Sequence, residues 1–186
     1  MRNLSGKRIA ILATDGYEQS ELEIPHARLR EAGAAVDVIS LKPGTIRSWH
    51  HHEWGRPMDV DRTLSDASAD DYDALVLPGG QMNPDMLRQE PDVISFIRGF
   101  WTQKKVIAAI CHAPWLLIEA GLVRGRNVTS YHSIRTDLIN AGGIWHDEGV
   151  VVDQGLVTSR KPTDLELFCL KVAEEVAEGP HQRRAA

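Results

Sequence analysis

Cys111 is the residue of this chain best placed for nucleophilic chemistry. It follows the apolar run Val106–Ile110 and precedes a second apolar stretch that begins with His112 and contains Pro114. The first run is typical of a buried parallel strand, and a proline is tolerated in the first turn of a helix. The thiol is therefore expected at a sharp turn between a strand and a helix, which resembles the nucleophile elbow of hydrolases.

The helix start beneath Cys111 predicts an acidic thiol. Free N–H groups and the helix dipole favour the thiolate, so we expect the pKa of Cys111 to lie below its ordinary value of about 8.5. His112 is suited to proton transfer near neutral pH and can act as a base or orient the nucleophile. A small buried cysteine that closes a strand is the alternative, and the adjacent polar histidine argues against it.

Two other turns hold groups that could complete a site. Glu18 and Glu21 lie on one face of a predicted helix start, where each either complements the helix dipole or places a protonated carboxyl against the sulfur. The Gly-Gly turn that ends at Gly80 lets backbone N–H groups approach a ligand. Together with the N–H of His112 it could form an oxyanion hole. Asp85 lies just beyond, in an expected turn.

Strand and helix patterns alternate along the chain, which predicts an α/β fold with a mostly parallel sheet and helices on both faces. Ligands of such sheets bind beyond the carboxyl ends of the strands, where the three turns lie. The expected strands span residues 8–13, 35–40, 74–77, 106–110, 128–129, 150–152 and 156–158, the last two as a hairpin. The expected helices span residues 19–32, 92–103, 112–121, 134–141 and 164–178. Residues 45–63 are expected to be irregular, with a short alternation over 58–61 that suits a hairpin arm.

Length and charge limit the classes of protein that fit. The 186 residues suit a single domain over 1–186, with a core from 7 to 178 and a frayed tail over 179–186. A net charge of −5 with scattered basic residues argues against a nucleic-acid partner. A polar N-terminus and the lack of a long apolar run argue against a membrane partner. Two cysteines make no disulfide framework, so a reducing cytoplasm is the expected location.

Several further features are expected to be structural, and neither a metal nor a cofactor is predicted. Consecutive side chains alternate in direction, so His50–His52 make a poor single-ion cage and a solvated loop is favoured over a metal site. Trp49 and Trp54 are expected to cap the core or fill a subunit interface. Cys169 is expected to be an inert core thiol. Arg160 either shapes an anion-friendly pocket or forms a structural ion pair. No phosphate-binding glycine motif follows the first strand.

In its motifs the chain resembles the ThiJ/PfpI superfamily, which includes PfpI-type intracellular cysteine peptidases and the parkinsonism-associated deglycase. The motifs occur in family order from about residue 8 to 176, and the PfpI branch fits best. The matching segments are Asp15–Glu21, Leu75–Gly80, Ala109–Pro114, Gly125–Arg126, Thr129–Tyr131, Ile139–Gly142, Val150–Asp153 and Thr158–Arg160.

The resemblance implies a flavodoxin-like three-layer sandwich, which class-I glutamine amidotransferases share. It implies that Cys111 is the reactive and oxidation-sensitive nucleophile and that His112 is the histidine beside it. Glu21 is the family glutamate that contacts the thiol, and Glu18 is the second acid of that helix. Tyr131 stands where the family places a residue of the pocket wall.

The resemblance also implies a partner subunit. In PfpI-type peptidases an acid from the neighbouring subunit completes a Cys-His-acid triad, and the matching position is Asp85, with a loop length that differs by one. A homodimer or higher homo-oligomer is therefore implied. The late His-x-Glu pair of amidotransferases has no counterpart, because residues 158–164 contain no histidine, which argues against glutamine hydrolysis.

Two hypotheses of function follow, and the sequence favours the first. The chain is a cytoplasmic stress-protection enzyme, a cysteine hydrolase that acts on a small carbonyl or peptide substrate as a peptidase, a protein deglycase or a glyoxalase-like enzyme. Alternatively, it is a non-enzymatic redox-sensing or chaperone-like stress protein that acts through oxidation of Cys111. An inert scaffold of the same fold would have a thiol with ordinary alkylation kinetics.

Overall fold

A seven-stranded sheet forms the centre of the molecule. The computed structural model describes residues 1–179, so only Gly179 of the tail predicted over 179–186 falls within it. The strands, in spatial order, are β11 (Val150–Asp153), β12 (Leu156–Ser159), β8 (Val106–Ile110), β7 (Ala74–Leu77), β1 (Arg8–Leu12), β3 (Ala35–Ser40) and β6 (Arg62–Thr63). Neighbouring strands run parallel except β11, which pairs with β12 as the predicted antiparallel hairpin. All residues of β7 and β8 are buried, as expected for strands covered on both faces.

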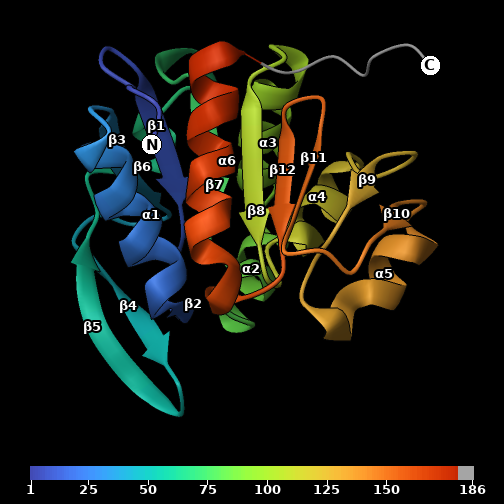
Figure 1. Ribbon diagram of the computed structural model, residues 1–186. Coiled ribbons are helices and arrows are strands. Elements are labelled where there is room, and N and C mark those ends of the chain that lie inside the picture. The colour runs from blue at the N-terminus through green and yellow to red at the C-terminus, as the bar shows by residue number, and fades with distance from the viewer. Residues whose placement is uncertain (180–186) are drawn as a thin grey trace.

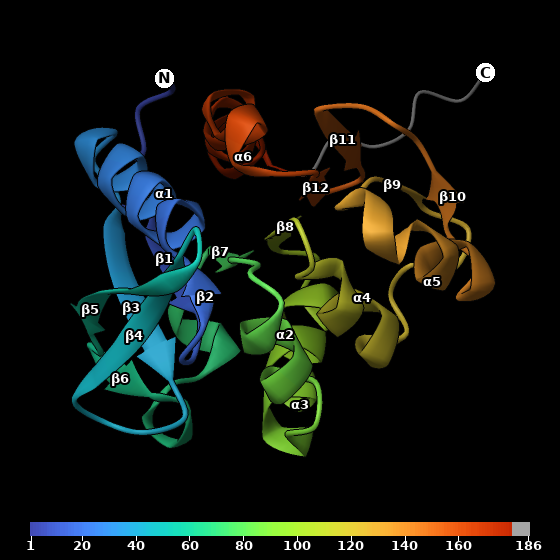
Figure 2. The ribbon, with the colours of Figure 1, turned by 90° about the horizontal axis from the view of Figure 1, so that it is seen from below.

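Helices cover both faces of this sheet, and Figure 2 shows the two layers in a view along it. One layer holds α1 (Gln19–Glu31) and α6 (Leu165–Glu178). The opposite layer holds α2 (Met82–Leu87), α3 (Pro91–Thr102) and α4 (Pro114–Ala120). Each layer encloses its own apolar core against the sheet. The predicted flavodoxin-like three-layer sandwich is confirmed.

Smaller elements lie at the edges of the sandwich. At one edge, α5 (Arg135–Asn140) packs beside the two short strands β9 (Asn127–Val128) and β10 (Ile144–Trp145), as Figure 1 shows. The described chain also contains four 3-10 turns: η1 (Leu64–Asp66), η2 (Ala69–Asp71), η3 (His132–Ile134) and η4 (Pro162–Asp164). No helix within residues 1–179 has both the length and the apolar character needed to cross a bilayer.

Two sequence predictions of local structure were wrong. Residues 45–63 are not irregular, because β4 (Thr45–His50) and β5 (Glu53–Asp59) form a hairpin that joins β2 (Tyr17–Glu18) in a three-stranded sheet and projects from the sandwich (Figure 1). Its turn uses a non-glycine residue at positive φ, His51 (φ 54°), so the usual glycine signal was missing. Asp85, expected in a turn, lies in α2, since Pro84 occupies the first helical turn, where proline is tolerated.

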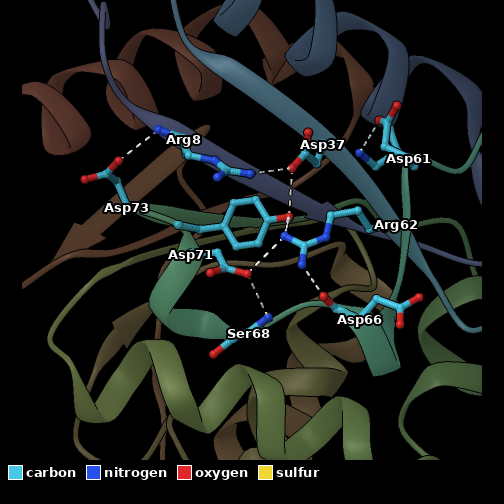
Figure 3. Close-up of polar contacts among 10 residues, drawn as sticks. Arg8, Asp37, Asp61, Arg62, Asp66, Ser68, Asp71 and Asp73 are labelled. Carbon is cyan, nitrogen blue, oxygen red and sulfur yellow. Dashed lines mark hydrogen bonds and ion pairs between the residues drawn. The ribbon is translucent and has the colours of Figure 1, made fainter.

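A polar network fixes the edge strand β6 to the sheet (Figure 3). Arg62 donates to Asp71 Oδ2 (3.0 Å) and to Tyr72 Oη (3.3 Å). The Tyr72 hydroxyl donates to Asp37 Oδ2 (2.8 Å), which also receives a bond from Arg8 Nη2 (3.1 Å). Burial, together with the bond to Asp37, raises the pKa of Tyr72 to about 12, so the phenol remains a donor. The network therefore joins β1, β3, β6 and η2.

Candidate active site

Cys111 occupies the predicted turn between β8 and α4 in a strained conformation. Its φ of 65° lies in the left-handed region that non-glycine residues rarely adopt. Its N–H donates to the carbonyl of Ser159 (3.0 Å), and its carbonyl accepts from the N–H of Tyr131 (2.8 Å). Two segments distant in sequence thus hold the backbone of this residue, and the nucleophile-elbow geometry is confirmed.

Glu21 is fully buried at the start of α1, next to the sulfur. Its Oε2 accepts a hydrogen bond from the N–H of Gly79 (2.9 Å). Burial raises the pKa of Glu21 to about 8, and the charge of Glu18 acts in the same direction. The other oxygen, Oε1, accepts no hydrogen bond from any residue in the described range. At neutral pH the carboxyl is therefore mainly protonated, and its proton is available to the Cys111 sulfur, with which it interacts.

The expected acidity of Cys111 is not found in this chain. The residue is 6% exposed, and burial raises the pKa of its thiol above the ordinary value. A charged Glu21 raises this pKa further, whereas the N–H groups of Gly80 and His112 lower it. The prediction from the helix start was wrong because desolvation of the sulfur outweighs two backbone donors. The repulsive contribution of Glu21 vanishes when its carboxyl is protonated.

The Gly-Gly turn brings backbone close to both side chains. A Cβ atom on Gly79 would lie 2.6 Å from Glu21 Oε2 and 2.7 Å from Cys111 Cβ, so no larger residue fits. Gly80 has a φ of +75°, and its Cβ would lie 2.5 Å from the carbonyl oxygen of Gly16. Glycine is therefore required at both positions. The N–H groups of Gly80 and His112, predicted as an oxyanion hole, both act on the sulfur.

His112 stands between the thiol and a hydroxyl. Its Nδ1 lies 3.2 Å from Cys111 Sγ, and its Nε2 lies 3.1 Å from Ser133 Oγ. The ring stacks on Tyr131, with centroids 4.8 Å apart, and meets Trp115 edge-on at 5.4 Å. Burial lowers the pKa of His112, and the charge of His132 contributes. The imidazole is therefore neutral at pH 7 and in contact with the sulfur.

The two remaining predicted site residues have different surroundings. Glu18 caps α1, since its Oε2 accepts from the Glu21 N–H (2.9 Å) and the Ser20 hydroxyl (2.5 Å), which supports the structural interpretation of this acid. Asp85 is exposed on α2. Within residues 1–179 its carboxylate makes no hydrogen bond to His112. The Cys-His-acid triad is not formed inside one chain, and its completion by a neighbouring subunit stays a prediction.

Comparison with known proteins places the chain in a family. The family model described as the DJ-1/PfpI family matches residues 7–175. The chain belongs to the DJ-1/PfpI family. It is 43% identical over 162 residues to the protein YraA of Bacillus subtilis, covering 87% of this chain and 94% of YraA. It is 42% identical over 158 residues to the protein named Deglycase PfpI of Pyrococcus furiosus, covering 85% and 92%.

A solved structure agrees with this assignment. The crystal structure of Drosophila melanogaster DJ-1beta is similar with a TM-score of 0.85 and 32% identity, and the match covers 92% of this chain and 90% of that one. The family assignment agrees with the resemblance drawn from the motifs. The similarity to DJ-1beta supports the same fold for this chain.

Two residues of this DJ-1/PfpI site were missed by sequence reasoning. Ser133 and His132 lie in η3 and act on His112 through a hydrogen bond and through charge. The motif ending at Tyr131 stops just before them. A serine in a short exposed turn has no pattern that distinguishes it from a solvated residue, so only the three-dimensional arrangement reveals its contact.

The structure of this DJ-1/PfpI protein also shows the surroundings of the other features predicted from the sequence. Arg160 forms ion pairs with Asp147 (2.8 Å) and Asp164 (3.0 Å), which favours the structural alternative. Cys169 lies on α6 and is buried in the core, as predicted, and burial raises its pKa to about 12. Across residues 1–179, no three side chains of His, Cys, Asp or Glu gather as metal ligands. His50–His52 form the end of β4 and the hairpin turn.

Proposed function

We propose that this protein is a cysteine hydrolase that acts on amides or carbonyl adducts, with deglycation as the favoured activity. The supporting observation is the contact of Cys111 with a neutral imidazole on one side and a protonated carboxyl on the other. The relative named Deglycase PfpI points to carbonyl adducts as the substrate class. Peptidase and glyoxalase-like activities use the same groups.

The geometry supports a two-step reaction. The thiol proton passes from Cys111 to Nδ1 of His112, and the sulfur forms a bond to the substrate carbonyl carbon. The carbonyl oxygen gains negative charge and receives hydrogen bonds from the N–H groups of Gly80 and His112. In an amide substrate the protonated imidazole then gives its proton to the amine nitrogen as the C–N bond breaks, which leaves a thioester on Cys111. For an amide substrate, water attacks the resulting thioester, restores the thiol and releases the acid.

Glu21 supports the anionic sulfur in this proposal. Near pH 7 its carboxyl is mainly neutral, because burial raises its pKa to about 8. A neutral carboxyl does not repel the thiolate and can donate a hydrogen bond to it. Glu21 and Cys111 thus share protons as a coupled pair, and the thiolate state depends on the proton of Glu21.

The assembly and location belong to the same proposal. A homodimer or higher homo-oligomer would bring the exposed Asp85 of a second copy toward His112, where it would act beside Ser133 as the acid of the triad of PfpI-type peptidases. A stress-protection role in the cytoplasm remains the prediction made from the family resemblance and from cysteine usage.

Replacement of the nucleophile tests the proposal directly. We expect Cys111→Ser to lower the rate of turnover of methylglyoxal adducts and of small peptides by at least about 100-fold. Cys169→Ala is the matched control, because that thiol is buried in the core, and it should leave the rate unchanged. Equal rates for wild type and Cys111→Ser on both substrate classes would refute the proposal.

A redox-sensing role is the second candidate, and the N–H groups directed at the sulfur favour it. Donors that stabilise a thiolate also stabilise the sulfinate oxidation product. After mild peroxide treatment, we expect mass spectrometry to find Cys111, which is 6% exposed, oxidised before Cys169, which is 1% exposed. Equal oxidation of the two cysteines would remove the basis of this role.

A further inference from the structure

Nε2 of His112, the ring nitrogen that does not face the sulfur, is hydrogen-bonded to a hydroxyl. In Cys-His pairs an acid more often occupies this place. Ser133 Oγ lies 3.1 Å from Nε2, and Cys111 Sγ lies 3.2 Å from Nδ1. The three groups form a continuous chain of hydrogen bonds inside one subunit. No carboxylate within residues 1–179 bonds the ring. Asp137, on the neighbouring α5, accepts a bond from Trp115 Nε1 instead (2.8 Å).

We propose that Ser133 is a positioning residue that holds the His112 ring with Nδ1 facing the sulfur and adapts its hydrogen bond as the proton moves. This inference rests on the proposed function, because it assigns a role within the same reaction. It concerns the tautomer and the orientation of His112, and Ser133 does not contact the reacting atoms.

A hydroxyl suits this position because it can donate or accept. When Cys111 is a thiolate and neutral His112 carries its proton on Nδ1, Nε2 is bare and the Ser133 hydroxyl donates to it. When the thiol donates to Nδ1, the proton of neutral His112 is on Nε2 and Ser133 accepts. In the imidazolium both nitrogens carry protons, and Ser133 again accepts. A carboxylate could only accept, so it would fix one tautomer and stabilise the imidazolium.

The backbone around Ser133 is anchored even though its side chain is exposed. Before it, the N–H of Tyr131 donates to the carbonyl of Cys111 (2.8 Å). After it, Ile134 is buried in the core. The hydroxyl is therefore presented from a fixed turn, so its position relative to the imidazole is set by the fold.

The other groups that face His112 do not replace this contact. Tyr131 stacks on one face of the ring, and Trp115 meets it edge-on. Both contacts limit tilting of the ring but offer no hydrogen bond to Nε2. His132 acts on the imidazole through its charge. Cys111 and Ser133 are thus the two hydrogen-bonding partners of the ring among the described residues.

Three substitutions at position 133 test the inference by kinetics. We expect Ser133→Ala to lower kcat on a methylglyoxal adduct by about 10-fold with little change in KM, the effect of losing one orienting hydrogen bond. Ser133→Thr, which keeps the hydroxyl, should restore kcat to within about twofold of wild type. Ser133→Asp should move the acidic limb of the pH profile to higher pH, since a carboxylate stabilises imidazolium. Thr136→Ala, an exposed hydroxyl deletion in α5, is the control and should match wild type.

A measurement without substrate separates this inference from the proposed function. The ¹⁵N shifts of the His112 ring report which nitrogen carries the proton. We expect them to change in Ser133→Ala and to be kept in Ser133→Thr. This result would support the role of Ser133 even if no adduct were turned over. Unchanged ring shifts in Ser133→Ala, or equal losses of kcat in the alanine and threonine variants, would overturn the inference. So would a loss of kcat in Asp85→Asn with none in Ser133→Ala.

Discussion

Glu21 shows how a single buried carboxyl can determine the state of a neighbouring thiol. It has no exposed surface, and one of its two oxygens lacks a hydrogen-bond donor within the described chain. Burial therefore keeps it neutral over most of the physiological range. The proton on this group decides whether the sulfur faces a hydrogen-bond donor or a second negative charge.

The raised pKa of Glu21 predicts a specific dependence of stability on pH. The folded protein holds this proton up to about pH 8, whereas the unfolded chain releases it near 4.5. The free energy of unfolding therefore falls as pH rises between these values, by about 1.4 kcal/mol for each unit of difference in pKa. Glu21→Gln has no proton to release, so the variant should gain stability relative to wild type as pH rises from 4.5 to 8.

Urea denaturation at several pH values between 4.5 and 8 measures this difference. Titrating groups that do not interact with Glu21 contribute equally to both proteins, so they cancel in the comparison. A difference in free energy that stays constant over this range would mean that Glu21 is ionised in the folded state.

The sequence predicted most of the residues of the site correctly, but it did not predict the pKa of the thiol. Cys111, His112, Glu21 and the Gly80 N–H come together as the motifs implied. The acidity of the thiol was predicted wrongly because the sequence shows the helix start but not the depth of burial. Ser133 was missed because its contact with His112 spans 21 positions in the chain and has no periodic pattern.

At the scale of elements, the short edge strand β6 is held by side-chain bonds as well as by its own pairing. It consists of two residues and pairs with β3 only through Arg62 and Thr63. The bonds of Arg62 to Asp71 and Tyr72, and of Tyr72 to Asp37, add side-chain attachment (Figure 3). Just before β6, Asp61 also exchanges two hydrogen bonds with the backbone of Val38 in β3. Arg62 also donates to the backbone carbonyl of Asp66.

Removal of one hydroxyl should weaken this edge. Tyr72→Phe keeps the buried ring but deletes the donor to Asp37 and the acceptor for Arg62. We expect a loss of about 1 kcal/mol in the free energy of unfolding, because a partly buried carboxylate and guanidinium each lose a partner. Chemical denaturation measures the loss, and a variant as stable as wild type would show that water replaces both bonds.

The elements predicted best are those with a long apolar run or a clear end. The strands at 74–77 and 106–110 and the helix that ends at Gly121 (φ +77°) match the structure closely. Of the hairpin of β4 and β5, only the end of β5 at Met58-Asp59 was expected, since the outer strand is largely exposed and lacks strict alternation. The six residues of α2 were missed since Asn83-Pro84 is also typical of a turn.

At the scale of the whole molecule, the projecting hairpin leaves an aromatic side chain in solvent. Trp54 is 44% exposed and meets Trp49 edge-on at 5.5 Å. Large exposed aromatic residues are enriched at subunit interfaces. This arrangement is compatible with the predicted role of these tryptophans in a homo-oligomer.

Light scattering tests that assembly. We expect a solution mass at least twice the 20.7 kDa of one chain, and we expect Trp54→Ser to shift the population toward the monomer. Ile139→Ser is the control, because Ile139 is 45% exposed on α5, at the opposite edge of the sandwich (Figure 1). A wild-type mass of one chain would contradict both the oligomer and the interface role of Trp54.

The two backbone bonds that hold Cys111 have a consequence for biosynthesis. One of them comes from Ser159, 48 positions further along the chain, on a strand that must pair with β8 before the bond can form. Before the ribosome has synthesised this strand, the nascent chain lacks the hydrogen bond to Ser159 that helps to hold residue 111 at positive φ. We therefore expect residue 111 to adopt its positive φ only after β12 has paired with β8.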